Sequence, residues 1–387
     1  MLKNLAITKR LVALSLMVVA ILMLGPQKLI GAPLRIVYIT PAAHGNPYWT
    51  EVFEYMNKAA ADLDIVFEHM DLGTVDRYSI NEVAKALMMG PNRPSALIVA
   101  VAYGNTIPLL ELAELYHIPV VVQGFLFPQE LNRIGREPRN QFKYWIASLE
   151  QDEELKAYLS ATALLKKTVE SVPVGSKKKI RVLALEGVAR WKAQSLRFEG
   201  FERALLHFPE VELVQSIQVP WMAEKARALT KKLLTRHKDI HAIWCATDLI
   251  AQGAATAAEE KGYKVGKNIF LSGIDLSRNG LSLMAKDKIV ATSSAPAPFF
   301  GLALVMLHDY LKGQDFKLDF GTVWSPEIVF GDKSNALQIT RTLNDFKRVD
   351  FKKYSKFYHG DTFSYEKRFY EDFYRMSKQP LEIDKTN

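Results

Sequence analysis

Short apolar runs rich in β-branched residues alternate with longer amphipathic stretches from Leu34 onward, and no other feature restricts the fold of this 387-residue chain as strongly. The expected strands lie at 34–40, 65–69, 96–101, 118–123, 179–185, 211–217, 241–245 and 269–272. The expected helices lie at 49–63, 77–89, 106–116, 197–206, 222–236 and 248–261. Because the longer stretches carry apolar residues at helical spacing, the alternation predicts an α/β protein with parallel sheets covered by helices on both faces.

Eight strands are best accommodated in two sheets, each doubly wound. We expect the break between 148 and 178, where a charged helix at 151–170 leads into a loop that contains Pro173 and Gly175. A lysine run at 177–179 follows, and we interpret it as a solvated surface rather than as a nucleic-acid contact. The chain is therefore expected to have two main domains and no nucleic-acid partner.

The first 32 residues have the order of a signal peptide. Three basic residues precede an apolar run at 11–24, and small residues follow at Gly31-Ala32. The run is shorter than the roughly 20 residues of a membrane-spanning helix. This pattern predicts export with cleavage after Ala32, and an uncleaved membrane anchor is the alternative.

Charge and cysteine content set two further limits. Four of the 50 basic residues and none of the 42 acidic residues lie in the leader, so the net charge falls from +8 to +4 without it. Cys245 is the one cysteine of the chain, which excludes an internal disulfide. Stability must come from apolar burial.

A turn at Asn46-Pro47-Tyr48-Trp49 directly follows the first expected strand and opens a helix. Asn is a good cap for free backbone amides, and Pro suits the first helical turn. Open α/β sheets bind ligands at the carboxyl ends of their strands, so the two aromatic rings are placed to stack on a small molecule. The alternative is a hydrophobic staple at an ordinary helix start.

Polar and aromatic residues follow four other predicted elements in the same way. They are Arg197 at a helix start, Trp221 after a strand, the pair Thr247-Asp248 and the turn residue Asp275. The indole of Trp221 offers a flat apolar face, the guanidinium of Arg197 offers several hydrogen-bond donors in one plane, and the aspartates offer carboxylate acceptors. Together these groups suit a compact polyhydroxylated ligand. Each residue also has a structural alternative, which is an ion pair for Arg197, the core for Trp221, a helix cap for Asp248 and a turn for Asp275.

Motifs typical of enzymes are missing from the sequence. There is no GxxxxGK[ST] loop, strand-linked GxGxxG, GxSxG or HExxH, and the eight histidines are scattered. We therefore expect no enzyme, no cofactor and no metal site. An enzyme that acts on carbohydrate through Asp248 and Asp275 is the alternative, and turnover of a bound ligand would identify it.

From about 34 to 331 the sequence resembles the type I periplasmic binding proteins, in particular the ribose-binding-like group that includes autoinducer-2 receptors. The resemblance is carried by four segments, which are Asn46-Pro47-Tyr48-Trp49, Arg197 before Gly200-Phe201, Cys245-Ala246-Thr247-Asp248 with Gln252-Gly253-Ala254, and the strand from Leu271 to Asp275. It implies that Asn46, Thr247 and Asp275 are polar contacts, that Tyr48, Trp49 and Trp221 are ring walls, and that Arg197 is a hydrogen-bonding fork.

Two departures from the family pattern concern the ligand. Gly124-Phe125 stands where an Asp-Arg pair is expected, and Ala295 stands where a Gln is expected. These changes remove an acid, an arginine and an amide from the implied pocket. They favour a ligand that is smaller, less hydroxylated or differently charged than a free aldopyranose.

The resemblance implies two lobes that close on a sugar-like ligand in the periplasm. The first lobe is expected at 33–147 plus 296–323 and the second at 148–295 plus 324–345, with a three-stranded hinge near 148, 295 and 324. The closed form would engage an ABC-type permease, or alternatively a membrane sensor protein. Repressors that share this fold carry a helix-turn-helix ahead of the first strand, where this chain has the leader.

Residues 346–387 extend beyond the usual end of the family, and the part from 346 to 376 is crowded with Phe and Tyr among charged residues. So aromatic a segment is not expected to be disordered. It either packs along one domain or meets a partner protein. As an extension with an aromatic surface, it is expected to be dispensable for ligand binding and needed for solubility or partner engagement.

Overall fold

Six parallel strands form the larger sheet, in the order β11-β5-β4-β3-β1-β2. Their bounds are β1 (Leu34–Thr40), β2 (Ile65–Asp71), β3 (Ala96–Ala100), β4 (Val120–Gln123), β5 (Trp145–Leu149) and β11 (Val323–Trp324).

The computed structural model describes residues 33–40, 45–73, 77–102, 104–171, 179–189, 191–360 and 364–377. The predicted leader lies outside these residues, and none of the described helices is long and apolar enough to cross a membrane.

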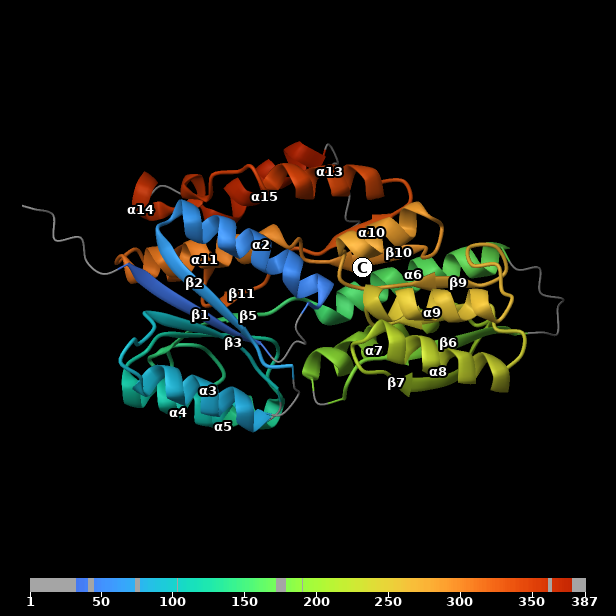
Figure 1. Cartoon of the computed structure of the whole chain (residues 1–387), viewed down its shortest axis with the longest axis horizontal. Helices are drawn as coiled ribbons and strands as arrows, with labels where there is room; N and C mark the ends of the chain where they lie inside the picture. The colour runs from blue at the N-terminus through green and yellow to red at the C-terminus, as the bar shows by residue number, and fades with distance from the viewer. Residues whose placement is uncertain are drawn as a thin grey trace, which may run out of the picture. The chain divides into compact units, whose positions relative to one another are not determined.

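Helices cover both faces of this sheet (Figure 1). One face carries α3 (Arg77–Met89), α4 (Thr106–Tyr116) and α5 (Pro128–Ile134), and the other carries α2 (Pro47–Asp62) and α11 (Pro298–Leu311). Successive residues of a strand point to opposite faces, and in β1 Val37 joins one core while Tyr38 joins the other. Burial on both faces explains why the inner strands β3 and β4 and most of β1 read as nearly continuous apolar runs, whereas the edge strand β2 carries polar residues and is mostly not buried.

Four parallel strands form the second sheet, in the order β7-β6-β8-β9. Its strands are β6 (Ile180–Glu186), β7 (Val211–Gln218), β8 (Ala242–Cys245) and β9 (Phe270–Ser272). Its helices are α6 (Glu153–Ser171), α7 (Lys192–Leu205), α8 (Ala223–Arg236), α9 (Asp248–Glu260) and α10 (Arg278–Ala285). The antiparallel pair β10 (Ala291–Ser294) and β12 (Val329–Asp332) adjoins it, because the amide of Gly273 donates to the carbonyl of Ala291.

Three segments connect the two sheets. They are 150–152 between β5 and α6, 295–297 between β10 and α11, and 325–328 between β11 and β12. The prediction of an α/β protein with two doubly wound parallel sheets and three connections is confirmed. The lobe boundaries given above stay a prediction.

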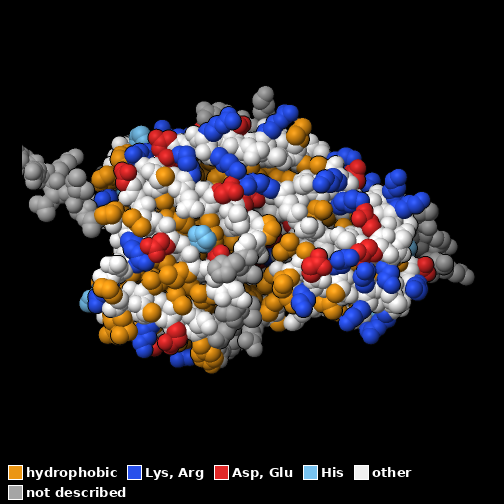
Figure 2. Space-filling model, in the orientation of Figure 1, with side chains coloured by type: hydrophobic (Ala, Val, Ile, Leu, Met, Phe, Trp, Pro, Cys, Tyr) orange, Lys and Arg blue, Asp and Glu red, His pale blue; other side chains and the backbone are white. Residues whose placement is uncertain are grey.

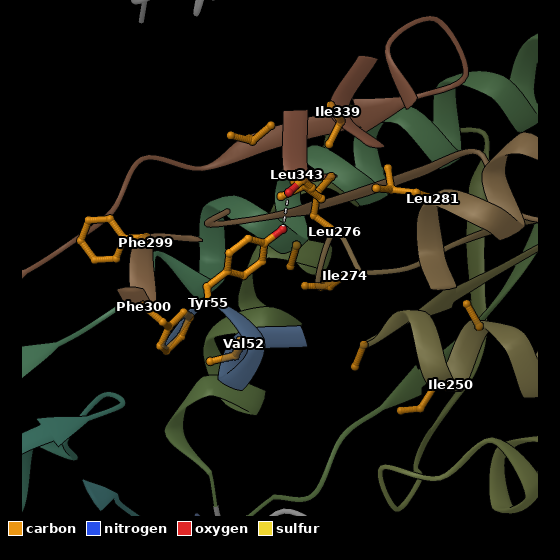
Figure 3. Close-up of a cluster of buried hydrophobic side chains, with 14 of the residues drawn as sticks. Val52, Tyr55, Ile250, Ile274, Leu276, Leu281, Phe299, Phe300, Ile339 and Leu343 are labelled. Atoms are coloured by element: carbon orange, nitrogen blue, oxygen red, sulfur yellow. Dashed lines mark hydrogen bonds between the residues drawn. The ribbon is translucent and has the colours of Figure 1, made fainter. Parts of the chain in front are cut away.

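The C-terminal residues form four short elements and two longer helices. They are α12 (Lys317–Phe320), α13 (Ala336–Phe346), the 3-10 helix η1 (Phe351–Tyr354), α14 (Lys356–His359) and α15 (Tyr365–Ser377), with β12 ahead of α13. Helices α13 and α15 lie along the outer side of α2 and α11 (Figure 1). The Tyr55 hydroxyl of α2 donates to the carbonyl of Leu343 in α13 at 2.6 Å, in a cluster that includes Phe299 and Phe300 (Figure 3).

The aromatic residues of this segment are mostly in the core. Side chains that are at most 1% exposed are Phe346, Phe351, Tyr354, Tyr365, Phe369 and Phe373. The fully buried Asp309 of α11 accepts hydrogen bonds from Ser355 Oγ (2.5 Å), Lys356 N (2.5 Å) and Tyr365 OH (2.9 Å). The expectation of an aromatic surface is therefore wrong for these six side chains, and the alternative that the segment packs along one domain is the one observed. Whether the segment is dispensable for ligand binding is not tested by these contacts. Its rings pack along one domain, since they are needed to cover α2 and α11.

Basic and acidic side chains are interspersed on the face shown in Figure 2. Arg227 and Lys231 of α8 both pair with Glu260 of α9, and Lys288 pairs with Glu259. Such pairing is typical of a solvated surface rather than of a surface that binds polyanions.

Candidate ligand-binding site

The start of α2 presents two aromatic rings beside the larger sheet. Asn46 caps this helix, since its Oδ1 accepts from the amides of Tyr48 (3.1 Å) and Trp49 (3.4 Å), and Pro47 occupies the first turn. The cap uses the side-chain oxygen of Asn46 and leaves its amide nitrogen for any ligand contact. The capping part of the sequence interpretation is therefore observed directly.

Trp49 is only partly buried but belongs to an aromatic cluster. Its ring centroid lies 5.7 Å from that of Tyr38, 5.7 Å from that of Phe53 and 6.3 Å from that of Phe300. The Tyr38 hydroxyl donates to Gln123 Oε1 at the end of β4, at 3.0 Å. Trp49 thus supports the core of this lobe as well as presenting a face.

Arg197 lies on α7, and its side chain is 10% exposed. Its Nε donates to Glu153 Oε2 at 2.7 Å, and its Nη1 donates to the carbonyl of Ala246 at 2.6 Å and lies 3.7 Å from Asp275 Oδ1. Burial by itself lowers the pKa of Arg197, but the carboxylates of Glu153 and Asp275 outweigh it, so the net shift of the pKa is upward. Arg197 is therefore a fixed positive charge with two of its three nitrogens held.

Trp221 packs against the same arginine. The Arg197 guanidinium carbon lies 5.9 Å from the centre of the indole, which is partly buried. The far edge of the ring rests on Gly187, where an added Cβ would lie 1.6 Å from Trp221 Cη2. Only glycine at 187 leaves room for this indole position.

Asp275 follows β9 in a turn with φ of +125°, a conformation that L-residues rarely adopt. Its amide donates to the carbonyl of Ser293 at 3.2 Å, which holds the turn to β10. Burial raises the pKa of Asp275 to about 8, although the nearby Arg197 charge lowers it. The carboxyl group is thus placed to donate or accept a hydrogen bond at neutral pH.

Thr247 and Asp248 hold the start of α9. Thr247 Oγ1 accepts from the amide of Ile250 at 3.1 Å, and Asp248 Oδ2 accepts from Ser277 N (3.0 Å) and Ser277 Oγ (2.7 Å). Added Cβ atoms at Gly273 and Gly280 would lie 2.2 and 2.1 Å from the Asp248 carboxylate oxygens. Burial raises the pKa of Asp248 to about 6. The turn encloses this carboxylate, so we remove Asp248 from the proposed ligand contacts.

Three buried residues of α6 and the connection before it were missed by the sequence analysis. Gln151 Nε2 donates to the Tyr48 hydroxyl (3.3 Å), while Gln151 Oε1 accepts from Lys156 Nζ (3.0 Å) and Ser294 Oγ (3.2 Å). Lys156 is 1% exposed and pairs with Glu153 at 2.8 Å. The only signal in the sequence was a Glu and a Lys spaced by three in a charged helix, which equally describes a solvated helix.

These contacts bring four of the predicted site residues together. Arg197, Trp221 and Asp275 of the second lobe form one group. Tyr48 of the first lobe is linked to it by a chain of contacts through Gln151, Lys156 and Glu153. Burial raises the pKa of the Tyr48 phenol, and the charge of Asp275 raises it further, so the hydroxyl is neutral. The described residues contain no cluster of His, Cys, Asp and Glu that could hold a metal ion.

Comparison with known proteins assigns the family. The family model described as "Periplasmic binding protein domain" matches residues 36–315. The chain belongs to this family, as its sequence resemblance implied.

Two relatives and one solved structure illustrate the match. The chain is 27% identical over 135 residues to the ribose import binding protein RbsB of Haemophilus influenzae and 30% identical over 140 residues to the D-allose-binding periplasmic protein of Escherichia coli. These alignments cover 35% and 36% of this chain but only 44% of each relative. The structure of a periplasmic sugar-binding protein from Pseudomonas fluorescens has a TM-score of 0.76 and 25% identity, with coverage of 89% of this chain and 99% of that one.

The raised pKa of Asp275 predicts a pH dependence of stability. A carboxyl whose pKa is about 8 in the folded chain, above its ordinary value of 3.8, holds its proton more tightly when folded. Its contribution to the free energy of unfolding is fully present below pH 3.8 and is lost as the pH rises through 8. Asp275→Asn, which resembles the protonated acid, should therefore remove a decline of about 4 kcal/mol between pH 5 and 8.5, because the slope is about 1.4 kcal/mol per pH unit up to the folded pKa.

Urea unfolding of both chains at pH 5 and 8.5 measures this difference. Asp287→Asn is the matched control, because the Asp287 side chain is 58% exposed. An Asp275→Asn chain with the same decline as the unaltered chain would contradict the prediction.

Proposed function

We propose that this chain is a periplasmic solute-binding protein that closes around a small, polar, sugar-like ligand and delivers it to an ABC-type permease. One observation carries the proposal. Two buried residues at the start of α6 and just before it, Gln151 and Glu153, contact site residues of both lobes. Gln151 donates to Tyr48 of the first lobe, and Glu153 accepts from Arg197 of the second lobe. Arg197 in turn lies beside Trp221 and Asp275. The proposed contacts are Asn46, Tyr48, Trp49, Arg197, Trp221, Thr247 and Asp275.

The chemistry of these groups suits a ring with hydroxyl groups. Trp221 and Trp49 offer apolar faces for stacking, and the described residues give no hydrogen bond to Arg197 Nη2, which makes it the nitrogen left for a ligand oxygen. A ligand that touches both lobes only when they are close together shifts the open–closed equilibrium toward the closed form. That closed form is what a permease would recognise.

The departures from the family pattern support a sparsely hydroxylated ligand. Gln123 Oε1 is already engaged by the Tyr38 hydroxyl, and Ala295 is 2% exposed and offers no polar atom. Fewer groups are therefore free to satisfy ligand hydroxyls than in the implied sugar pocket. We expect deoxy or small sugars to bind more tightly than free aldopyranoses.

Calorimetric titration with a panel of sugars tests the proposal. The panel contains D-ribose, D-allose and their deoxy derivatives, and binding of at least one with a dissociation constant in the micromolar range or below is expected. Absence of heat and of thermal stabilisation across the panel would contradict a sugar-like ligand. Uptake of the bound sugar in cells with and without the gene then separates transport from a receptor role, in which a signalling output changes instead.

Export is part of the proposal. We place the mature N-terminus at Pro33, on the basis of the leader pattern alone. N-terminal sequencing of the protein released from the periplasm measures it directly. An intact Met1 on a membrane-bound product would support the anchor instead.

Trp221→Ala is expected to weaken ligand binding and to leave folding nearly unchanged. Its indole is partly buried and rests on Gly187 and Arg197, so its removal takes away one wall of the site rather than a core residue. Loss of one stacking wall costs on the order of 1–3 kcal/mol. Calorimetry with the tightest sugar of the panel and thermal unfolding are the two measurements.

Trp49→Ala provides the contrast, because Trp49 also packs on Tyr38 and Phe53. We expect it to lower both the affinity and the melting temperature. Met222→Ala, next to Trp221 and 48% exposed, is the control for surface effects. If the Trp221→Ala chain has unchanged affinity and a much lower melting temperature, Trp221 is a core residue and not a wall of the ligand site.

A further inference from the structure

Helices α2 and α10 meet in an ion-pair cluster that contains none of the proposed ligand contacts. Glu51 and Glu54 lie one and two helical steps of three residues beyond Tyr48. Arg278 begins α10, three residues after Asp275. Glu51 and Glu54 are therefore within about two helical turns of Tyr48. Arg278 is joined to Asp275 by one short turn of chain.

Arg278 holds both glutamates. Its amide donates to Glu51 Oε2 at 3.0 Å, its Nη1 donates to Glu54 Oε1 at 3.0 Å, and its Nη2 pairs with Glu54 Oε2. Lys347, just after α13, adds a contact of 2.9 Å to Glu54. Hydrogen bonding to Arg278 lowers the pKa of Glu54 to about 2, so this carboxylate is charged at all physiological pH values.

One contact in the cluster is incomplete. Glu51 is 4% exposed, and its Oε1 and the Nε of Arg278 are buried, lie 3.6 Å apart and have no hydrogen-bond partner among the described residues. A small relative movement of α2 and α10 is enough to bring these two atoms within hydrogen-bonding distance. The cluster is thus sensitive to the spacing of the two helices.

The Arg278 side of the cluster is fixed to the second lobe. Ser277, its neighbour, donates from both its amide and its hydroxyl to the buried Asp248 at the start of α9. The turn from Asp275 to Arg278 is therefore held by Asp248 from within its own lobe and by the two glutamates from the other lobe. Arg278 contacts α2 and lies only three residues after Asp275, so we expect a shift of α2 to move the Asp275 turn.

We propose that Arg278 is a positioning residue that, with Glu51 and Glu54, clasps α2 to α10 and sets the spacing between the two halves of the ligand site. Tyr48 and Trp49 are carried by one side of this clasp and Asp275 by the other. The proposal that these ion pairs join α2 to α10 depends only on the contacts of Arg278 with Glu51 and Glu54. The proposal that they affect ligand affinity also depends on the proposed ligand-binding function.

The distance between the lobes tests the clasp without any ligand. Lys85 of α3 and Lys225 of α8 are exposed and belong to different lobes, so each is replaced by Cys and spin-labelled, while Cys245 is buried. Electron–electron double resonance then gives the distance distribution for the unaltered pair, for Arg278→Gln and for Glu54→Gln. Arg227→Gln is the matched control, since Arg227 pairs with Glu260 inside one lobe.

We expect Arg278→Gln and Glu54→Gln each to broaden the distribution, and the double variant to broaden it no more than Arg278→Gln alone. Arg278→Lys keeps the charge but not the fork and should give an intermediate distribution. If the fraction of molecules with the correct spacing falls to about one tenth, the affinity for the tightest sugar of the panel falls about tenfold. Glu54 is 39% exposed, so its variant tests the clasp even if Arg278→Gln misfolds.

Three results would overturn the proposal. Coincident distributions for the unaltered chain and both variants would show that no clasp exists, whether or not a sugar binds. A broadened distribution with unchanged sugar affinity would show that the clasp does not position the site. A broadened distribution in Arg227→Gln would show that the readout reports general loosening. If the unaltered chain binds no sugar, the proposed function fails, and the distances alone decide the clasp.

Discussion

A chain that ends at Asp345 is expected not to fold. The truncation removes six aromatic side chains that are at most 1% exposed, which are Phe346, Phe351, Tyr354, Tyr365, Phe369 and Phe373. Loss of one buried aromatic typically costs about 3–5 kcal/mol, whereas a whole domain is stable by about 5–15 kcal/mol. The truncation also removes three hydrogen-bond donors to the buried Asp309 carboxylate, which are Ser355 Oγ, Lys356 N and Tyr365 OH.

Circular dichroism and thermal unfolding of the truncated chain measure this outcome. A chain that ends at Ser377 keeps every helix and strand described above and is the matched control. A third chain, Tyr365→Phe, removes a single donor to Asp309 and should lose only about 1 kcal/mol. A cooperative melting transition near that of the full chain after truncation at Asp345 would contradict the assignment of these rings to the core.

Arg197→Lys is expected to lower ligand affinity about 100-fold, which corresponds to about 2.7 kcal/mol. The arginine fork uses Nε for Glu153 and Nη1 for the Ala246 carbonyl, so only a third nitrogen in the same plane can reach a ligand oxygen. A lysine has one nitrogen, which can pair with Glu153 or reach the ligand but cannot keep this geometry. Stability should fall less than affinity, since an ammonium still balances the buried carboxylate.

Calorimetry with the tightest sugar of the panel gives the affinity, and urea unfolding gives the stability. Arg203→Lys is the matched control, because Arg203 lies on the same helix and pairs with Glu154 of α6 at 2.7 Å on the surface. It should bind like the unaltered chain. Equal affinity in Arg197→Lys would mean that the arginine only supports Glu153 and Ala246 and does not contact the ligand.

Most of the strands were predictable because burial on both faces leaves a continuous apolar signal. The strand expected at 34–40 matches β1, and all eight expected strands are present with ends within two residues. β10 was missed because its sequence, Ala-Thr-Ser-Ser, is polar although every residue of it is buried. β11 has only two residues and is defined by its pairing with β5, which no local pattern reveals.

The candidate site was predictable where topology determines position. Parallel strands end at one edge, so residues after the strands, such as Trp221 and Asp275, could be assigned to that edge from the order of elements alone. The burial of Glu153 and Lys156 was not predictable from the sequence, because α6 carries charges on several sides. Only its packing against α7 decides which side is covered. The sequence analysis included Asp248 among the ligand contacts because it too follows a strand. The direction of its side chain depends on the turn at Ser277, which the sequence does not show.

The C-terminal segment shows the same division most clearly. Its composition alone determined that it would be ordered, since so many aromatic residues cannot stay in water without a partner surface. Only the tertiary structure decided that this partner is the chain itself, through contacts such as the Phe351 amide with Asp62 and the Tyr365 hydroxyl with Asp309. These pairs are 289 and 56 residues apart in the sequence, and burial between distant segments follows from the packing of the whole chain rather than from any local pattern.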